Sequence, residues 1–374
     1  MQTSNQATCG TQQKGTVSRR PTRKGLALWR PATSAPYYYS LKFYYNQLFG
    51  FPVRKISIDA GFSCPNIDGT VGRGGCIFCD NQSFSPSRRS STTLMKSGEI
   101  ISNTGEGSSL LPGATKMLPF AAARNSEIRN QILEATKHYE IREPGAKYIA
   151  YFQPSTNTYA PIEQLELLYY EALAEKNIIG LAIGTRPDTL PDDVLGLFES
   201  IAAKTYFVVE MGLQSPHDKT LKFLNRGHDY QTFLDAFHRL VKRKINVNIH
   251  LILGLPGETR DDMLGTAHEI AHLRPHSVKL HNLYVPRNTT LAAMYYDERV
   301  RLPTIDQYAS YVVDFLERQP PETVIDRVVA DGHSAHTIAP SWYRNKNLVF
   351  NKIEAEFAHR QTWQGKMAVT KKLH

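Results

Sequence analysis

The chain has 374 residues, 41% of them hydrophobic, which is enough for one barrel-sized domain with extensions. No apolar run approaches eighteen residues, so no membrane-spanning helix or membrane partner is expected, and four cysteines favour a reducing, cytoplasmic compartment over a disulfide scaffold. Residues 1–58 carry nine Lys and Arg and no acidic residue, which leaves 35 basic against 35 acidic residues in the rest of the chain. This neutral body argues against a uniformly basic nucleic-acid-binding protein.

The first 36 residues show no hydrophobic periodicity, and we predict a disordered basic tail at residues 1–36. An acid-poor, Arg-rich tail is also typical of an organelle transit peptide, so organelle targeting is the alternative to a cytoplasmic location. Residues 37–51 are rich in aromatic side chains and predict a short helix packed on the domain. Residues 53–59 alternate apolar and polar positions and predict the first strand.

Three of the four cysteines follow that strand, in the segment IDAGFSCPNIDGTVGRGGCIFCDN. Cys64, Cys76 and Cys79 have the spacing C-x11-C-x2-C and lie among glycines, which let a backbone wrap closely around a non-protein group. Such a set of thiolates indicates an iron–sulfur or a zinc site. The fourth cysteine, Cys9, lies far away in the tail, and no histidine lies between Cys64 and Cys79.

Three thiolates without an obvious fourth ligand predict a site with one open position, by the logic that separates catalytic from structural metal sites. In a four-iron cluster, three cysteines would hold three irons and leave the fourth iron free to bind a small molecule. The alternatives are a zinc knuckle completed by a distant histidine, or three unrelated cysteines.

The remainder of the chain alternates strands and helices. Residues 86–124 are rich in Ser, Thr and Gly and predict a low-complexity insertion, followed by a helix at residues 125–140. Repeated β-α units imply a parallel sheet with right-handed crossovers, here with six strands rather than the eight of a closed barrel. Further strands are predicted at 147–152, 178–183, 205–209, 246–253 and 277–280, with a possible edge strand at 324–328. Further helices are predicted at 161–176, 191–203, 217–225, 230–244, 260–273, 289–296 and 303–318.

Polar residues cluster where the predicted strands end, which is where such sheets bind ligands. Each cluster has a structural explanation of its own, such as helix capping by Asp188 or ion pairing of Glu210 with Arg186. Their joint placement after successive strands nevertheless indicates one shared site. The clusters are Gln153–Asn157, Gly184–Asp188, Glu210–Ser215, Gly254–Glu258 and Lys279–Asn282, and His250 and His281 lie near the same strands.

The cysteine segment resembles the cluster loop of the radical S-adenosylmethionine (SAM) superfamily, whose common spacing is C-x3-C-x2-C. The longer first gap resembles one branch, the YhcC/YtqA-type proteins related to the Elongator catalytic subunit. That branch carries the signature GGFSCPNRDGT-x-GRGGC-x-FC, which stands here as AGFSCPNIDGTVGRGGCIFC. The stretches IGTRPD, E-x-G-x-Q-S, NRGHD and GLPGE are also similar to motifs of that branch.

The resemblance covers residues 38 to 365 approximately and implies an α/β partial (β/α)6 barrel at residues 37–330, with a small C-terminal extension at 331–374. It implies a [4Fe-4S] cluster on Cys64, Cys76 and Cys79 and SAM at the strand ends. The superfamily's usual Gly-Gly-Glu motif for the SAM ammonium is missing, and FQPST stands in its place. The SAM-binding residues that the resemblance implies are Gln153, Ser155, Arg186, Glu210, Gln214, Ser215, Arg226, Gly254, Leu255 and Pro256.

The implied function is that of a radical SAM enzyme, in which SAM is cleaved reductively to a 5′-deoxyadenosyl radical that abstracts hydrogen from a substrate. The implied partners are a flavodoxin, ferredoxin or reductase as electron donor and either a tRNA base or a small metabolite as substrate. No catalytic residue is assigned. The alternative from a different class is a zinc-stabilised RNA-binding or scaffold protein without catalysis.

Overall fold

The structure, a computed structural model, describes residues 36–85 and 117–368, with the backbone alone for residues 117–126. Cys9, almost all of the predicted tail at residues 1–36 and most of the predicted insertion at 86–124 therefore lie outside the described residues. No helix within the described ranges is both long and apolar enough to cross a membrane.

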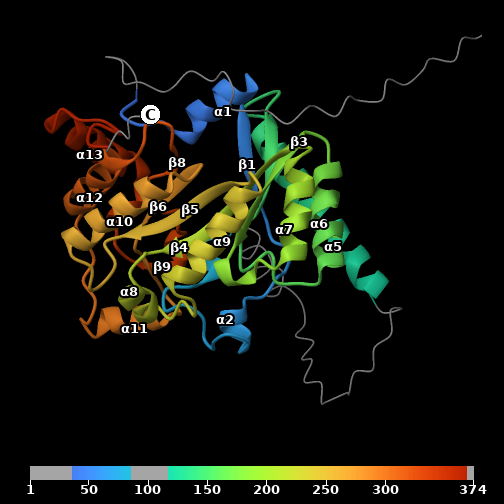
Figure 1. The fold of residues 1–374 in the computed structure, drawn as a ribbon, viewed down its shortest axis with the longest axis horizontal. Helices are drawn as coiled ribbons and strands as arrows, with labels where there is room; N and C mark the ends of the chain where they lie inside the picture. The colour runs from blue at the N-terminus through green and yellow to red at the C-terminus, as the bar shows by residue number, and fades with distance from the viewer. Residues whose placement is uncertain (1–35, 86–116, 369–374) are drawn as a thin grey trace, which may run out of the picture.

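Seven parallel strands form one sheet in the order β1-β2-β3-β4-β5-β6-β8 (Figure 1). The predicted α/β partial barrel is confirmed, and the suggested edge strand at residues 324–328 is present as β8, which pairs with β6. The strands are β1 (Val53–Ile58), β2 (Lys147–Phe152), β3 (Ile178–Thr185), β4 (Tyr206–Gln214), β5 (Asn246–Leu253), β6 (Ser277–Asn282) and β8 (Val324–Arg327).

The sheet curls until side chains of its two edge strands meet. Lys55 Nζ on β1 lies 2.7 Å from Asp326 Oδ2 on β8, although the other five strands separate β1 from β8 in the sheet. The interior of this half-barrel therefore collects side chains from strands that are far apart in the sequence.

Helices cover the outer face of the sheet (Figure 1). In α9 (Tyr230–Lys242), the Asp229 side chain caps the helix by accepting from the Thr232 amide, and residues at helical spacing, such as Phe233 and Phe237, are buried against the strands. The other long helices are α5 (Met117–Glu140), α6 (Ile162–Ala174), α7 (Asp192–Ala202), α10 (Arg260–Leu273), α12 (Ile305–Arg318) and α13 (Lys346–His359).

Helix α5 begins at Met117, before the predicted start at residue 125, so the end of the predicted insertion is helical. The sequence predicts the later start because Asn125 and Ser126 are residue types that commonly cap helices.

The amino-terminal end of the barrel is plugged by α1 (Leu41–Phe49), which lies at the end of the sheet opposite α2 (Pro65–Asp68) in Figure 1. Tyr44 and Tyr45 are buried there, and the Tyr45 ring packs edge-on against Tyr206 of β4 at a centroid distance of 5.7 Å. The predicted aromatic helix therefore closes one end of the barrel, and ligands have access from the other.

The short elements surround the carboxyl ends of the strands and the C-terminal segment. Strand β9 pairs antiparallel with β7, which ties the segment after residue 331 to the loop that follows β6. These elements are α3 (Asn81–Phe84), η2 (Pro187–Thr189), α8 (Asp218–Phe223), β7 (Val285–Pro286), α11 (Thr290–Tyr296), η3 (Ser334–His336), β9 (Thr337–Ala339) and η4 (Trp342–Arg344).

Candidate active site

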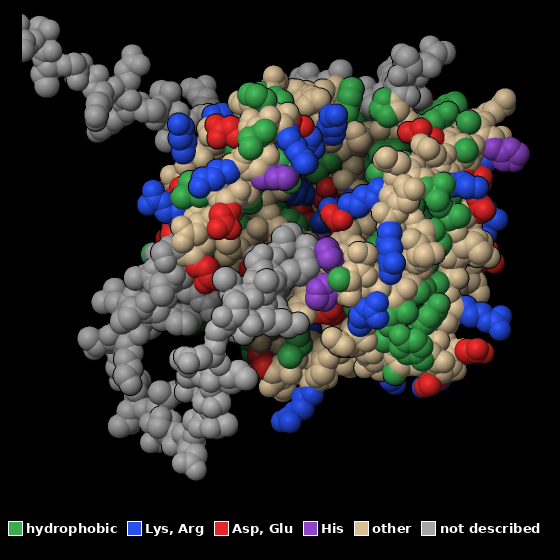
Figure 2. Space-filling model, turned by 180° about the vertical axis from the view of Figure 1, so that it is seen from behind, with side chains coloured by type: hydrophobic (Ala, Val, Ile, Leu, Met, Phe, Trp, Pro, Cys, Tyr) green, Lys and Arg blue, Asp and Glu red, His purple; other side chains and the backbone are tan. Residues whose placement is uncertain are grey.

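A cavity of about 220 Å³ lies between the cysteine loop and the carboxyl ends of the strands. Figure 2 shows one face of the molecule hollowed, with acidic, basic and histidine side chains gathered at the hollow. Nine of the residues proposed from the sequence line the cavity: Cys64, Cys76, Cys79, Gln153, Ser155, Arg186, Glu210, Gln214 and Arg226.

Four other proposed residues are not among the cavity-lining residues: Ser215, Gly254, Leu255 and Pro256. Ser215 is buried, and its hydroxyl donates to Glu258 Oε1 at 2.5 Å, which joins the loops after β4 and β5. The Gly254 amide donates to the Met263 sulfur of α10 at 3.3 Å, whereas Leu255 is buried in an apolar cluster with Ile252, against which Ile77 and Phe78 of the cysteine loop pack. Ile252, two residues earlier on β5, reaches the cavity instead.

The cysteine loop is built around a short helix. Cys64 precedes α2, and its carbonyl accepts the amides of Ile67 and Asp68 at 2.8 and 3.2 Å. The chain then turns back through Gly74 and Gly75, whose φ values of 79° and 73° are readily adopted only by glycine. The Cys79 amide donates to the Cys76 carbonyl at 2.9 Å, so these two cysteines share one tight turn.

Residues of the NRGHD motif hold this loop from the segment between α8 and α9. Asn225 Nδ2 donates to the Gly75 carbonyl at 2.7 Å, and Asn66 Nδ2 of the loop donates back to the Asn225 carbonyl at 2.6 Å. Arg226 is buried, and its guanidinium donates to the Cys76 sulfur at 3.3 Å and to the Gly212 carbonyl at 2.7 Å. The predicted SAM contact Arg226 therefore lies directly against the cysteine loop.

The three thiols line one cavity and affect one another electrostatically. Packing of protein atoms around the sulfur, and then the charges of Cys76 and Cys64, raise the pKa of Cys79 to about 12, even though this side chain is in part exposed. Among the described residues, no three Cys, His, Asp or Glu side chains are grouped closely enough to hold a metal ion. Thiolates of a cubane each bind a different iron, so they lie farther apart than ligands that share one ion.

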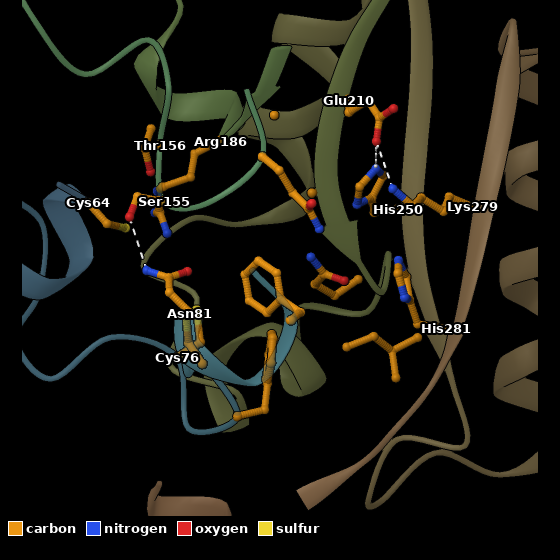
Figure 3. Close-up of a pocket in the computed structure, with 18 of the residues that line it drawn as sticks. Cys64, Cys76, Asn81, Ser155, Thr156, Arg186, Glu210, His250, Lys279 and His281 are labelled. Carbon is orange, nitrogen blue, oxygen red and sulfur yellow. Dashed lines mark hydrogen bonds and ion pairs between the residues drawn. The ribbon is translucent and has the colours of Figure 1, made fainter. Parts of the chain in front are cut away.

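Several buried polar atoms at the cavity lack a partner in the part of the chain that the structure describes. They include Asn81 Oδ1, Thr156 Oγ1 and Arg186 Nη1. The Asn81 amide donates to the Ser155 hydroxyl at 3.0 Å (Figure 3). Arg186 is paired with Asp188 at 2.7 Å, so both side chains are held in place. Because an unsatisfied buried polar atom is costly, these atoms are suited to a polar ligand.

Two residues at the cavity have unusual backbone conformations. Ser155 and Gln214 have φ values of 66° and 75°, in the left-handed region that non-glycine residues seldom adopt. Such conformations tend to be retained at functional sites, where the surrounding structure holds them. Both residues were proposed from the sequence as SAM contacts, which still rests on the family resemblance.

Glu210 is the centre of an ion network inside the barrel. Its carboxylate, fully buried, is bonded by Lys55 of β1, by Lys279 Nζ of β6 at 2.9 Å and by His250 Nε2 of β5 at 2.8 Å. The suggested pairing of Glu210 with Arg186 is wrong, because Arg186 pairs with Asp188. Figure 3 shows Glu210, His250 and Lys279 on the side of the cavity away from Cys64 and Cys76.

The network sets the charge states of its members. Burial alone would raise the pKa of Glu210, but the charges of Lys279 and Lys55 outweigh burial and hold that pKa well below its usual value. Burial lowers the pKa of Lys279, and burial followed by the Lys279 charge lowers the pKa of His250. Burial and then His250 hold the pKa of His281 well below its usual value. Both imidazoles are therefore neutral near pH 7.

Some cavity-lining residues were not proposed from the sequence as site residues. They include Asn81, Tyr151, Arg327 and Asp331, which come from α3, β2, β8 and the segment after β8. Asn81 could have been proposed from the sequence, because it lies two residues after Cys79 of the cysteine motif. Tyr151 sits within an apolar strand, and Arg327 depends on the closure of β8 onto the barrel, so their role required the structure.

Comparison with known proteins agrees with this geometry. The radical SAM superfamily model matches residues 68–270, and the Radical_SAM C-terminal domain model matches residues 275–359. The chain is 35% identical over 329 residues to the protein YtqA of Bacillus subtilis, which is 88% of this chain and 92% of YtqA. It is 31% identical over 300 residues to YhcC of Escherichia coli, which is 80% of this chain and 85% of YhcC.

A solved structure of the archaeal Elp3 of Methanocaldococcus infernus matches with a TM-score of 0.54 at 19% identity, over 68% of this chain and 62% of that one. At this identity the match shows a shared fold. The superfamily match and the relatives together cover the cysteine loop, the half-barrel and the C-terminal segment. The chain therefore belongs to the radical SAM superfamily of enzymes.

Proposed function

We propose that Cys64, Cys76 and Cys79 hold a [4Fe-4S] cluster at the mouth of the cavity, with SAM bound beside it. When bound, the reduced cluster supplies one electron that breaks the sulfur–C5′ bond of SAM, giving methionine and a 5′-deoxyadenosyl radical that takes a hydrogen atom from the substrate. The residues of this chain hold both groups and shield the reaction from water.

The observation that carries the proposal is the joint placement of three thiols and unsatisfied polar atoms on one cavity. Asn81 Oδ1 and Thr156 Oγ1 can accept from a ligand, and Arg186 Nη1 can donate to one, such as the carboxylate of a bound amino acid. Gln153 and Gln214 also line this cavity, and each carries a side-chain amide. A donor and acceptor set of this kind matches the polar groups of SAM.

The substrate and the electron donor are further parts of the proposal. A flavodoxin, a ferredoxin or a reductase is the class of partner that supplies single electrons. The Elongator-like motifs suggest a tRNA base as substrate, whereas the neutral body of the chain suits a small metabolite equally well.

The direct test is anaerobic reconstitution with iron and sulfide, followed by reduction in the presence of SAM. We expect about three to four irons per chain, SAM-dependent stabilisation against heat, and release of methionine and 5′-deoxyadenosine in equal amounts. A reconstituted cluster that binds no SAM and yields no 5′-deoxyadenosine would refute the proposal. Zinc without iron or sulfide would instead support the non-catalytic alternative, which the superfamily membership disfavours.

A second expectation concerns Arg226, which we treat as a positioning residue. Its guanidinium donates to the Cys76 sulfur at 3.3 Å, and hydrogen bonds to cluster sulfurs raise reduction potentials. Arg226→Gln should therefore lower the midpoint potential of the cluster. This potential is measured by a redox titration in which the reduced cluster is detected by electron paramagnetic resonance. Arg226→Lys keeps the positive charge, so its midpoint potential should lie between those of the wild type and Arg226→Gln.

A matched control separates this effect from a general loss of structure. Arg239→Gln alters an exposed arginine of α9 that pairs with Asp192 at 2.9 Å, and it should leave the potential unchanged. Equal potentials in wild type and Arg226→Gln, with full cluster content in both, would show that the Arg226–Cys76 contact does not tune the cluster.

A further inference from the structure

The wall of the cavity opposite the cysteine loop is rich in hydrogen-bond donors. We call it the donor wall and define it as Lys279, His281 and Arg327. Lys279 Nζ donates to Glu210 Oε2 at 2.9 Å and to the Tyr151 hydroxyl at 3.4 Å, so one of its three N–H groups has no partner among the residues that the structure describes. The His281 imidazole has no hydrogen bond to any residue that the structure describes, and its ring lies 5.5 Å from that of His250.

The acceptors on the same wall are already engaged. Glu210 is bonded by two lysines and a histidine, and Asp331 is paired with Lys346 and, at 3.6 Å, with Arg327. Within the described residues, the carboxylates that line the cavity are these two. A cationic or donor-rich ligand group would therefore find its acceptors occupied.

The charges around the wall do not cancel. Four cations meet three carboxylates, one of the four being Lys346, whose side chain is 45% exposed and does not line the cavity, and both imidazoles are neutral near pH 7. A positive charge that is partly removed from water is best compensated by an anion in the ligand. The groups are Lys55, Lys279, Arg327 and Lys346 against Glu210, Asp326 and Asp331.

The position of the wall separates it from the cluster side. Figure 3 shows His250, Lys279 and His281 across the cavity from Cys64, Cys76 and Asn81. Under the proposed function, SAM occupies the side next to the cysteines, so the donor wall faces the space left for the substrate. Glu210, a SAM contact in the sequence prediction, then binds Lys279 of the donor wall instead.

We infer that the substrate is a small molecule with an anionic oxygen group, a carboxylate or a phosphate, which is held by Arg327, Lys279 and His281. This inference rests on the proposed function, since it assigns the substrate of the same cavity. A tRNA base is the competing substrate class, but an uncharged base brings no anion to the donor wall. The phosphodiester groups of the tRNA belong to a backbone that is far larger than the cavity.

Binding can be tested without the cluster, on the full chain with ¹⁵N-labelled histidine. Sodium acetate and inorganic phosphate are titrated separately at constant pH and ionic strength, and the imidazole signals are followed by NMR. We expect saturable shifts at His281, assigned from its loss in His281→Gln, and no shift at the exposed His272. Arg327→Gln should weaken binding roughly tenfold, because it removes a charge-assisted contact. Arg327→Lys should recover part of the affinity, and the control Arg239→Gln should bind as wild type does.

A second arm uses the reconstituted, reduced protein with SAM. Cell extract is divided by size into bulk tRNA and small molecules, and the small molecules are divided on an anion exchanger. We expect the retained small-molecule fraction to stimulate 5′-deoxyadenosine formation, and Arg327→Gln to lose most of that stimulation.

The outcomes distinguish this inference from the proposed function. Stimulation by tRNA alone or by the unretained fraction overturns the anionic substrate while leaving the radical chemistry intact. Absence of 5′-deoxyadenosine under every condition overturns the proposed function, and the acetate and phosphate titrations then still decide whether the donor wall binds anions. Titrations that show no saturable shift at His281, or equal affinity in Arg327→Gln, overturn the inference.

Discussion

Cys76→Ala is expected to abolish cluster assembly and to reduce 5′-deoxyadenosine formation by more than about 100-fold, because a lost ligand costs more than the 10- to 100-fold typical of a lost supporting contact. Cys76 is buried at the centre of the loop and receives the Arg226 hydrogen bond at 3.3 Å. The measurements are iron and sulfide content, visible absorption of the reconstituted protein and 5′-deoxyadenosine by chromatography.

The chain offers a matched control in its fourth cysteine. Cys9→Ala removes a thiol outside the described residues and should leave iron content and activity at wild-type values. If Cys9→Ala also lost the cluster, the three-ligand site with an open position would be wrong. If Cys76→Ala lost bound zinc and thermal stability, while SAM changed the melting temperature of neither the wild type nor this variant, the non-catalytic alternative would be favoured.

Glu210→Gln is expected to lower the free energy of unfolding by about 3–5 kcal/mol, the usual cost of removing one partner from a buried ion pair. The substitution leaves Lys55 and Lys279 without the carboxylate that both contact. The measurement is urea denaturation of the full chain. Glu199→Gln is the control, because this glutamate is 60% exposed and lies 3.9 Å from Arg243, so its loss should cost less than about 1 kcal/mol.

Two further measurements check the reason for the effect. Glu210→Gln/Lys279→Met should recover part of the lost stability, because it also removes an unpaired charge. The folded pKa of Glu210 lies below its unfolded value, so its contribution is complete above about pH 4.3 and is lost as the pH falls through the folded pKa. Wild type should therefore lose stability more steeply than Glu210→Gln below about pH 4. Parallel acid profiles would contradict this assignment.

Much of the fold could be predicted because apolar runs and caps are local signals. The bounds of β2, β5 and α10 agree with the prediction. The predicted β4 stopped at Val209, but the strand continues to Gln214. Polar residues such as Glu210 had indicated a loop, whereas in a half-barrel the inner face of a strand carries polar side chains where it borders the cavity.

The candidate site was predictable to the extent that strand order places strand ends together. The cysteines, Gln153, Ser155 and Gln214 meet at one cavity for this reason. The partners of Glu210 could not be predicted, since Lys55 and Lys279 come from β1 and β6, and only the curl of the sheet brings them together. The bond from the Gly254 amide to Met263 of α10 and the burial of Leu255 among apolar side chains depend on tertiary packing, which no local pattern encodes.

The aromatic closure formed by α1 has a consequence for turnover. Tyr44, Tyr45 and Tyr206 fill the amino-terminal end of the barrel, so in the described part of the chain the cavity is closed at that end. Ligands therefore enter and leave on the side where the carboxyl ends of the strands lie. The aromatic closure also keeps bulk water from reaching a reactive species in the cavity from that end.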